Sequence, residues 1–413
     1  MRGAIRLSIC VAATVLAGCA DRDEVPDGPW RVTAELPGGQ LPFTLQLTRD
    51  EGGLSAVVVN GDEQVEVPRV IEDGSNLTLL FPAFNNRLEM QYGNGELTGT
   101  LILVKRDGVE QRMPLHGTHG EHRRFGSPEG GPGFDVSGRW SVVFTEDDGT
   151  ESAAVGEFRQ IGQLIQGTFL KTAGDHRYLA GEVSGEKLYL STFDGAHAFL
   201  FVAERTDVGT LQGDFWSGTQ WHEDWTAHAD PDAALPDANT MTHLKPGVER
   251  FDFSFPDPDG DTVSLSDERF RGKVVVVTLA GSWCPNCHDE ARFMAPFYLD
   301  KRDDGLEVVA LMFEHFGGFE RAAEQTRRFR EKFGIEYETL IAGTSDKDDA
   351  ASRLPTLDHL LAFPTTIFIG RDGSVRRIHT GFAGPGTGEY YERLTSEISD
   401  FVDELLAEPV PQT

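Results

Sequence analysis

The stretch that most constrains the fold of this chain is VVVVTLAGSWCPNC, residues 274–287, where a long apolar run leads into two cysteines three positions apart. Such a run, with almost no alternation of polar residues, is typical of a strand buried on both faces of a sheet. The helically spaced apolar residues that follow place the cysteines where this strand gives way to a helix. Taken alone, Cys284 and Cys287 fit a redox centre, half of a metal site or a structural disulfide.

The first 19 residues form a targeting segment. Basic Arg2 and Arg6 precede an apolar run from Leu7 to Gly18 that is too short to span a bilayer. The segment ends in Leu-Ala-Gly-Cys, which resembles the lipoprotein box of bacteria. This resemblance implies cleavage before Cys19, a lipid anchor on its thiol, and a membrane-anchored lipoprotein of the bacterial cell envelope that faces the periplasm. An ordinary secretory signal with an incidental cysteine is the alternative.

The cysteine content narrows the interpretation of the pair. The chain has four cysteines, of which Cys10 leaves with the signal segment and Cys19 would carry the lipid. A zinc site normally needs four ligands, and no second CxxC accompanies Cys284 and Cys287. The histidines within HGTHGEH, residues 116–122, are expected in a loop without metal. We therefore expect no metal and no cofactor beyond a redox-active disulfide.

Acidic residues dominate the charge of the chain. The sequence has 67 Asp and Glu against 37 Lys and Arg, and its formal net charge is −30 at pH 7. Nucleic acid and anionic lipid surfaces both attract basic proteins, so we expect no nucleic-acid partner and no electrostatic docking on a membrane.

Residues 20–235 show the short alternating runs of β structure in two similar copies, predicted at 20–125 and 126–235. Trp-Arg-Val at 30–32 has its counterpart in Trp-Ser-Val at 140–142, and the other matches keep an offset of about 110 to 114 residues. Each copy is expected to have about six strands and to resemble a lipocalin-like half barrel or a small antiparallel barrel. The pattern leaves open whether the copies close separately or together.

The pattern changes after a polar linker at 236–250, and residues 251–413 predict a mixed α/β domain. Expected strands lie at 273–280 and 306–313, expected helices at 287–299, 319–334 and 388–406, and a strand with its returning partner at 364–381. The chain is therefore expected to be multidomain, all-β in its N-terminal part and α/β in its C-terminal part.

Two stretches of this domain resemble a known family. Residues 252–287, DFSFPDPDGDTVSLSDERFRGKVVVVTLAGSWCPNC, resemble the beginning of TlpA/ResA-type thioredoxin-fold proteins, and residues 363–375, FPTTIFIGRDGSV, resemble their cis-proline strand. The resemblance implies a thioredoxin fold over 251–413 and dithiol–disulfide exchange through Cys284 and Cys287. It also implies protein thiols or disulfides as substrates and a membrane dithiol donor as partner.

The same residues have physical roles in such an exchange. Cys284 would begin the helix, where unpaired N–H groups and the helix dipole favour a thiolate, and Cys287 would resolve the mixed disulfide. Pro364, if cis, would bring backbone beside the sulfurs and offer a strand edge to a substrate. The supporting residues expected around this centre are Trp283, Pro285, Asn286, Phe363 and Thr365.

The proton carrier of this centre is less clear from the sequence. Thr278 stands where thioredoxin often has an aspartate, so no buried carboxylate is expected there. Glu314 and His315 follow the second buried strand, at the end where such folds place ligands, and either could carry the proton. The alternative is that both are solvated loop residues. His288 and Glu290, in the first helical turn, are expected to face solvent.

These observations predict a thiol–disulfide oxidoreductase that works as a reductase. A thiol peroxidase of the AhpC/TSA antioxidant type is one alternative, because peroxiredoxins share the wider fold. Those enzymes need a threonine three residues before the reactive cysteine and a proline further upstream, where this chain has Gly281 and Val277. The other alternative is a lipoprotein whose β units bind a ligand or partner and whose redox domain acts as a controller.

Overall fold

The computed structural model describes residues 24–126 and 133–411 of the chain. The predicted targeting segment, with Cys10 and Cys19, lies outside these residues. Within the described ranges, no helix combines the length and the apolar character that crossing a membrane requires.

The first β unit is an open antiparallel sheet of nine strands, in the order β4-β3-β2-β1-β9-β8-β7-β6-β5. Buried and exposed residues alternate along its long strands, so that one face carries the apolar core. The strands are β1 (Gly28–Leu36), β2 (Gly39–Asp50), β3 (Gly53–Asn60), β4 (Glu63–Glu66), β5 (Arg69–Asp73), β6 (Asn76–Phe81), β7 (Asn86–Gly93), β8 (Glu96–Val104) and β9 (Glu110–His119).

The second β unit closes on itself. Eight of its strands follow one another in antiparallel order, and β11 pairs with β12 to complete the ring, while the short β13 extends from the end of β12. The strands are β10 (Gly138–Glu146), β11 (Glu151–Ile161), β12 (Leu164–Lys171), β13 (Gly174–Asp175), β14 (Leu179–Ser184), β15 (Lys187–Phe193), β16 (Ala198–Arg205), β17 (Leu211–Ser217) and β18 (Trp221–Ala229). Both units thus exceed the six strands expected for each.

The internal repeat is visible in matching local structure. Trp30 on β1 donates a hydrogen bond from its ring nitrogen to the carbonyl of Pro26 at 3.0 Å, and Trp140 on β10 does the same to Val136 at 2.9 Å. In both units the tryptophan ring is buried beside the entering chain. The two copies share their strand pattern but close differently: the second is a barrel and the first stays open.

The open sheet completes its core with side chains of the barrel. Phe193, Ala198 and Leu200 come from β15 and β16, yet they belong to the apolar cluster of the first sheet. The ring of Phe193 lies 4.9 Å from that of Phe43, and its backbone carbonyl accepts a hydrogen bond from Asn60 at 2.8 Å. The outer face of the barrel therefore supplies part of the apolar core of the first sheet.

The histidines of residues 116–122 were expected in a loop, and this expectation was wrong for two of them. His116 and His119 lie on β9, where the alternating pattern continues through the glycine between them. The ring of His116 lies 3.2 Å from a carboxylate oxygen of Glu96, and that of His119 lies 2.8 Å from the carbonyl oxygen of Asp27.

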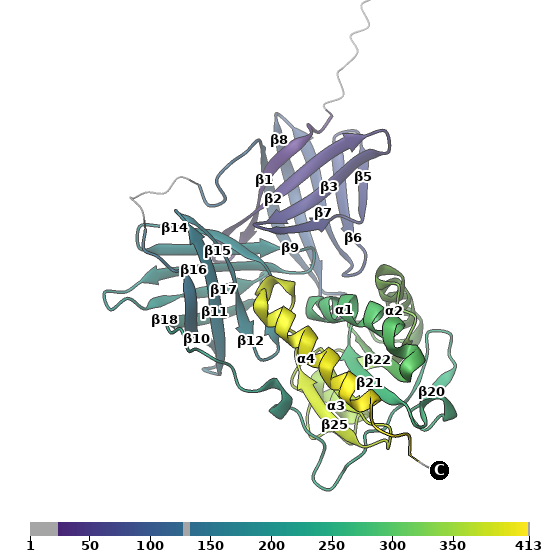
Figure 1. Ribbon diagram of the computed structural model, residues 1–413. Helices are drawn as coiled ribbons and strands as arrows, with labels where there is room; N and C mark the ends of the chain where they lie inside the picture. The colour runs from purple at the N-terminus through teal and green to yellow at the C-terminus, as the bar shows by residue number, and fades with distance from the viewer. Residues whose placement is uncertain (1–23, 127–132, 412–413) are drawn as a thin grey trace, which may run out of the picture.

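The C-terminal part is a five-stranded sheet in the order β23-β22-β21-β24-β25, with helices packed around it (Figure 1). Strands β21, β22 and β23 are parallel, whereas β24 runs antiparallel to β21. The main elements are β21 (Val274–Ala280), α1 (Pro285–Lys301), β22 (Leu306–Glu314), α2 (Phe319–Phe333), β23 (Glu338–Thr344), α3 (Lys347–Arg353), β24 (Thr365–Ile369), β25 (Val375–Thr380) and α4 (Glu389–Leu406). A two-stranded hairpin, β19 (Ser254–Pro256) and β20 (Thr262–Ser264), precedes them.

Most of these elements were predicted, but the hairpin of β19 and β20, strand β23 and helix α3 were not. The polar stretch 236–250 also differs from a free linker, because it packs on the α/β domain. Thr242 is buried and its hydroxyl is hydrogen-bonded to that of Thr380 at 2.8 Å, and Leu244 forms a β-bridge with Leu357. The three parts of the protein meet around the first turn of α1 (Figure 1).

The dependence of the open sheet on the barrel gives a testable prediction. Replacing Phe193 with alanine should destabilise the first sheet by about 3 to 5 kcal/mol, because a buried aromatic ring is lost from its core. Hydrogen–deuterium exchange should then accelerate in peptides from residues 28–119. Phe201→Ala, a matched change inside the barrel core, should accelerate exchange in 138–229 first. Equal effects of both substitutions on the first sheet would contradict this dependence.

Candidate redox site

The cysteine pair lies where β21 gives way to α1. Cys284 is the N-cap of α1, and its sulfur accepts the backbone N–H of Cys287 at 3.2 Å. The two cysteines form a disulfide with their Cα atoms 5.2 Å apart, and their residues are only 4% and 1% exposed. Pro285 occupies the first helical position, where its missing N–H costs no hydrogen bond.

The residues just before β24 bring backbone atoms close to the sulfur of Cys284. The peptide bond between Phe363 and Pro364 is cis, and the carbonyl oxygen of Phe363 lies 3.4 Å from the sulfur of Cys284. Thr365 begins β24, is fully buried, and donates its hydroxyl to the carbonyl of Ala362 at 2.8 Å. The segment just before β24 is the backbone that a bound substrate would meet beside the disulfide.

Trp283 and His315 form one wall of the site. The tryptophan ring stacks on the imidazole with 4.4 Å between ring centroids, and its N–H donates to the carbonyl of Phe313 at 2.8 Å. Burial, with smaller contributions from the nearby charges of Lys105 and Arg106, lowers the pKa of His315 to about 3. His315 is therefore a neutral ring at physiological pH, so it packs against Trp283 rather than carrying protons.

Glu314 is the last residue of β22, and it is buried rather than solvated in a loop. One carboxylate oxygen accepts the backbone N–H of Ser282 at 3.1 Å, and the other accepts the hydroxyl of Ser282 at 2.6 Å. Burial raises the pKa of Glu314 to about 7, although these hydrogen bonds oppose the shift. A carboxyl group with a pKa near neutral is thus hydrogen-bonded to Ser282, which lies two residues before Cys284.

Glu290 is a second buried carboxyl, and the prediction that it faces solvent was wrong. It lies three residues after Cys287, is 2% exposed, and accepts a hydrogen bond from the hydroxyl of Thr366. Thr366 pairs directly with Thr278 across β24 and β21. The helix therefore supplies a carboxyl next to the strand position where thioredoxin often has one, and burial raises the pKa of Glu290 to about 7.

His288 was also predicted to face solvent, and it too is buried. Its ring stacks on Phe84 of the first β unit with 4.6 Å between centroids, and its Nε2 lies 2.6 Å from the carbonyl oxygen of Ser282. Lys332 of α2 lies 3.1 Å from the other ring nitrogen. The first turn of α1 would be open in an isolated domain, but the β unit covers it here.

The β barrel also reaches this turn. The side chain of Asn286, between the two cysteines, donates to a carboxylate oxygen of Asp175 at 3.1 Å and to the carbonyl of Phe382 at 3.0 Å. Arg177 forms an ion pair with Asp289 of α1. Sequence reasoning missed Asp175 and Arg177, because no local signal links residues more than 100 positions before the CxxC motif to it.

A cavity of about 860 Å³ lies where the three parts meet. Its walls come from β4, from the turn after β6, from the barrel and from helices α1 and α2. Residues that represent these walls are Glu63, Phe84, Arg177, Pro285, His288 and Lys332. The space reaches Pro285 of the CxxC motif, so the junction of the three parts adjoins the redox site.

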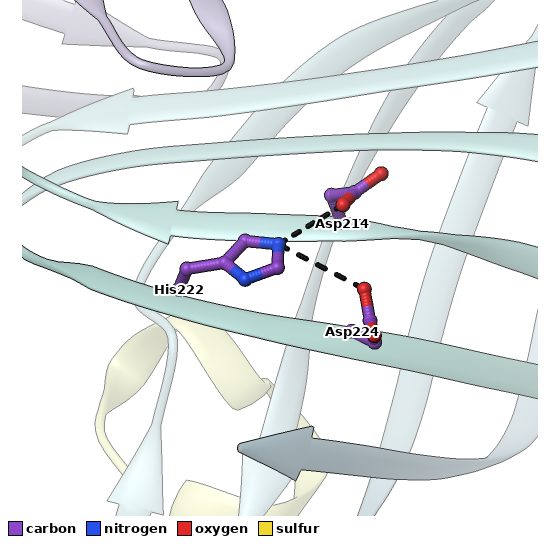
Figure 2. A group of neighbouring side chains, drawn as sticks. All are labelled: Asp214, His222 and Asp224. Carbon is purple, nitrogen blue, oxygen red and sulfur yellow. Dashed lines mark hydrogen bonds and ion pairs between the residues drawn. The ribbon is translucent and has the colours of Figure 1, made fainter. Parts of the chain in front are cut away.

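Among the described residues, one group of side chains could hold a metal ion, and it lies on the barrel (Figure 2). Nε2 of His222 lies 2.9 Å from Asp214 and 3.8 Å from Asp224, while Nδ1 lies 3.1 Å from Asp147. Hydrogen bonds from the His222 ring to Asp147 and Asp214 raise the pKa of His222. When the ring is protonated, its positive charge faces these carboxylates, so the geometry is explained without an ion.

The two buried carboxyls can be tested in the oxidised protein, where the cysteines do not titrate. Carbon-13 NMR of labelled glutamate should show Glu290 and Glu314 titrating at a pH of about 7. Thr366→Val should raise the pKa of Glu290 further, because the lost hydroxyl stabilises the charged form. Ser282→Ala should do the same for Glu314 and leave Glu290 unchanged.

The sign of the accompanying stability change follows from the same shifts. The folded protein binds these two protons more tightly than the unfolded chain, so they stabilise the fold below a pH of about 4.5 and this contribution is lost as pH rises through about 7. Titration of both groups near 4.5 would show that they are solvated.

Comparison with known proteins agrees with this geometry. The AhpC/TSA family model matches residues 246–378. Thiol-disulfide oxidoreductase ResA of Halalkalibacterium halodurans is 25% identical over 135 residues, which cover 33% of this chain and 68% of that protein. ResA of Geobacillus kaustophilus is 31% identical over 130 residues, which cover 32% of this chain and 66% of that protein.

A thioredoxin family thiol:disulfide interchange protein of Chlorobium tepidum is similar in structure, with 17% identity, a TM-score of 0.30, and coverage of 42% of this chain and 99% of that one. The matched segment spans about two thirds of the two ResA proteins. Over the matched residues 246–378, the C-terminal part of this chain is a thioredoxin-fold domain similar to the TlpA/ResA-like thiol–disulfide oxidoreductases.

Proposed function

We propose that the protein is a reductase of protein disulfides in the bacterial cell envelope. The observation that carries the proposal is the Cys284–Cys287 disulfide at the start of α1, beside the backbone carbonyl of Phe363. The helix start favours a thiolate on Cys284, and the backbone at the cis-peptide bond between Phe363 and Pro364 offers hydrogen bonds to an extended substrate.

The first step of the proposed reaction is attack by the thiolate of reduced Cys284 on a substrate disulfide. A bond forms between Cys284 and one substrate sulfur, the substrate S–S bond breaks, and the second substrate sulfur leaves as a thiolate. The N–H of Cys287, which bonds to the sulfur of Cys284 at 3.2 Å, stabilises the attacking thiolate.

The second step releases the substrate. Cys287 loses its proton and attacks the sulfur of Cys284, which re-forms the protein disulfide and frees the first substrate sulfur. Two electrons pass from the protein to the substrate, which becomes a dithiol when its two thiolates take up one proton from Cys287 and one from the solvent that received the proton of Cys284. Glu290 lies one helical turn after Cys287 and has a pKa of about 7, so its carboxylate accepts the proton of Cys287 and returns it to the leaving thiolate.

A donor must then reduce the Cys284–Cys287 disulfide for another turnover. In this proposal the donor is a membrane protein dithiol, as the resemblance to TlpA/ResA-type proteins implies. The donor attacks the Cys284–Cys287 disulfide by the same exchange chemistry and leaves the protein as a dithiol. No cofactor is needed beyond the disulfide itself, since every step exchanges one S–S bond for another.

Thiol peroxidase activity is the second candidate, favoured by the AhpC/TSA family match. A peroxidatic cysteine needs donors that activate the peroxide, and residue 281, three positions before Cys284, is a glycine without a hydroxyl. Stopped-flow oxidation of reduced protein by hydrogen peroxide should be no faster than that of free cysteine. A rate far above that of free cysteine would favour the peroxidase.

The exchange mechanism makes distinct predictions for the two cysteines. Cys284→Ser should reduce insulin no faster than dithiothreitol alone, whereas Cys287→Ser should trap a mixed disulfide through Cys284. The reduction potential of the wild-type pair should lie near that of thioredoxin, at about −270 mV. A value near about −120 mV would instead indicate an oxidase, and undiminished turnover by Cys284→Ser would exclude the mechanism.

The envelope location rests on the targeting segment and is tested separately. In the native bacterium, the full chain should incorporate labelled fatty acid and fractionate with membranes, because acyl chains on Cys19 insert into the bilayer. Cys19→Ser should lose the label and appear in the soluble periplasmic fraction. An unlabelled wild-type protein in that soluble fraction would indicate an ordinary secretory signal.

A further inference from the structure

The turn that follows β12 of the barrel fits closely against the CxxC motif. A side-chain carbon at Gly174 would lie 2.6 Å from the amide of Asn286, and one at Gly381 would lie 2.4 Å from the carbonyl oxygen of Thr172. Both glycines also have positive φ angles, at 143° and 82°. The contact between the barrel and the α/β domain therefore requires glycine on both sides. This double requirement indicates a specific contact rather than an incidental one.

Asp175 is bonded to both segments that frame the disulfide. One carboxylate oxygen accepts the amide of Asn286 at 3.1 Å and the backbone N–H of Gly384 at 2.7 Å. The other accepts the backbone N–H of Arg177 at 2.7 Å, which holds that residue in a left-handed conformation with φ of 63°. The carboxylate thus sits beside Asn286, one of the two residues that separate the cysteines.

Arg177 neutralises acids from all three parts of the protein. Its guanidinium pairs with Asp289 of α1, with Asp194 of the barrel at 3.1 Å, and with Glu63 of the first sheet at 3.7 Å. Arg177 and Asp289 are both buried, at 8% and 1% exposure. Asp289 lies two residues after Cys287, so this pair fixes the first turn of the redox helix from outside its own domain.

We infer that Asp175 and Arg177 of the barrel are positioning residues of the redox centre, which hold the first turn of α1 and set the charge that the Cys284 thiolate meets. This inference rests on the dithiol exchange proposed above. The β units then belong to the catalyst itself rather than serving only as a spacer. The active site is complete only in the full chain, because the α/β domain alone lacks both side chains.

The two residues should act in opposite directions. The negative charge of Asp175 opposes a thiolate on Cys284, so its removal should stabilise the reduced protein. Arg177 offsets the surrounding carboxylates, so its removal should destabilise the thiolate. A protein with a more stable reduced form is a weaker reductant and has a higher reduction potential. The potential should therefore rise when the charge of Asp175 is removed and fall when that of Arg177 is removed.

The test uses the full chain and the variants Asp175→Asn and Arg177→Met, with Arg159→Met as the control. Arg159 pairs with Asp62 at 2.8 Å in an ion pair whose side chains are 65% and 67% exposed, so solvent screens its charge. Two quantities are measured: the redox equilibrium with glutathione, and the pH midpoint for alkylation of Cys284 by iodoacetamide. Circular dichroism checks that each variant is folded.

Asp175→Asn should shift the glutathione equilibrium toward the reduced protein by about tenfold, equivalent to about 30 mV, and lower the alkylation midpoint. Arg177→Met should shift both in the other direction, and the control should match the wild type. Arg177→Lys should restore the wild-type potential at least in part, because it keeps the charge.

Unchanged potentials in Asp175→Asn, or shifts of the same sign in both variants, would overturn the inference and leave the turn as a packing contact. If Arg177→Met does not fold, Asp175→Asn and Arg177→Lys still decide the question. A wild-type protein that does not exchange with glutathione at all would count against the proposed function instead, so the two failures are distinguishable.

Discussion

A buried guanidinium joins the three parts of this protein. Arg177 contacts carboxylates of the first sheet, of the barrel and of the redox helix. A charge removed from water is tolerated only when opposite charges and hydrogen bonds surround it, so Arg177 is stable only with all three parts in place. The packing of the β units and the position of the CxxC motif are therefore parts of one electrostatic arrangement.

The barrel is the part on which the others depend. Its closed ring satisfies the backbone of every strand, whereas the first sheet remains open and uses Phe193, Ala198 and Leu200 of the barrel to complete its core. The barrel also extends the turn that carries Asp175 to the start of α1. One unit thus completes an apolar core on one side and a redox site on the other.

Burial decides the acid–base properties of the site. Glu290 and Glu314 would be ordinary charged residues in water, but in this core both have pKa values of about 7. The same burial makes His315 a neutral partner of Trp283. Thr278 supplies no carboxyl, yet its strand neighbour Thr366 holds one that the helix provides.

The sequence by itself determined the features that short-range patterns encode. The apolar run before Cys284 and the helical spacing after Cys287 predicted the strand–helix junction, and repeated tryptophans predicted two related β units. Periodicity carries this information because a strand or helix buries the residues that lie on one face. The short β23 and α3 escaped prediction because their sequences carry weak periodic signals.

Only the tertiary structure decided which β unit closes, which carboxyls are buried and which side chains reach the disulfide. The two β units share one strand pattern, but β12 pairs with β14 and closes the ring of the second unit, whereas β4 and β5 remain the two edge strands of the first. His288 is buried because Phe84, some 200 positions earlier, packs on it. Asp175 and Arg177 reach the site for the same reason: contacts between distant segments depend on how whole domains dock, which local sequence patterns do not encode.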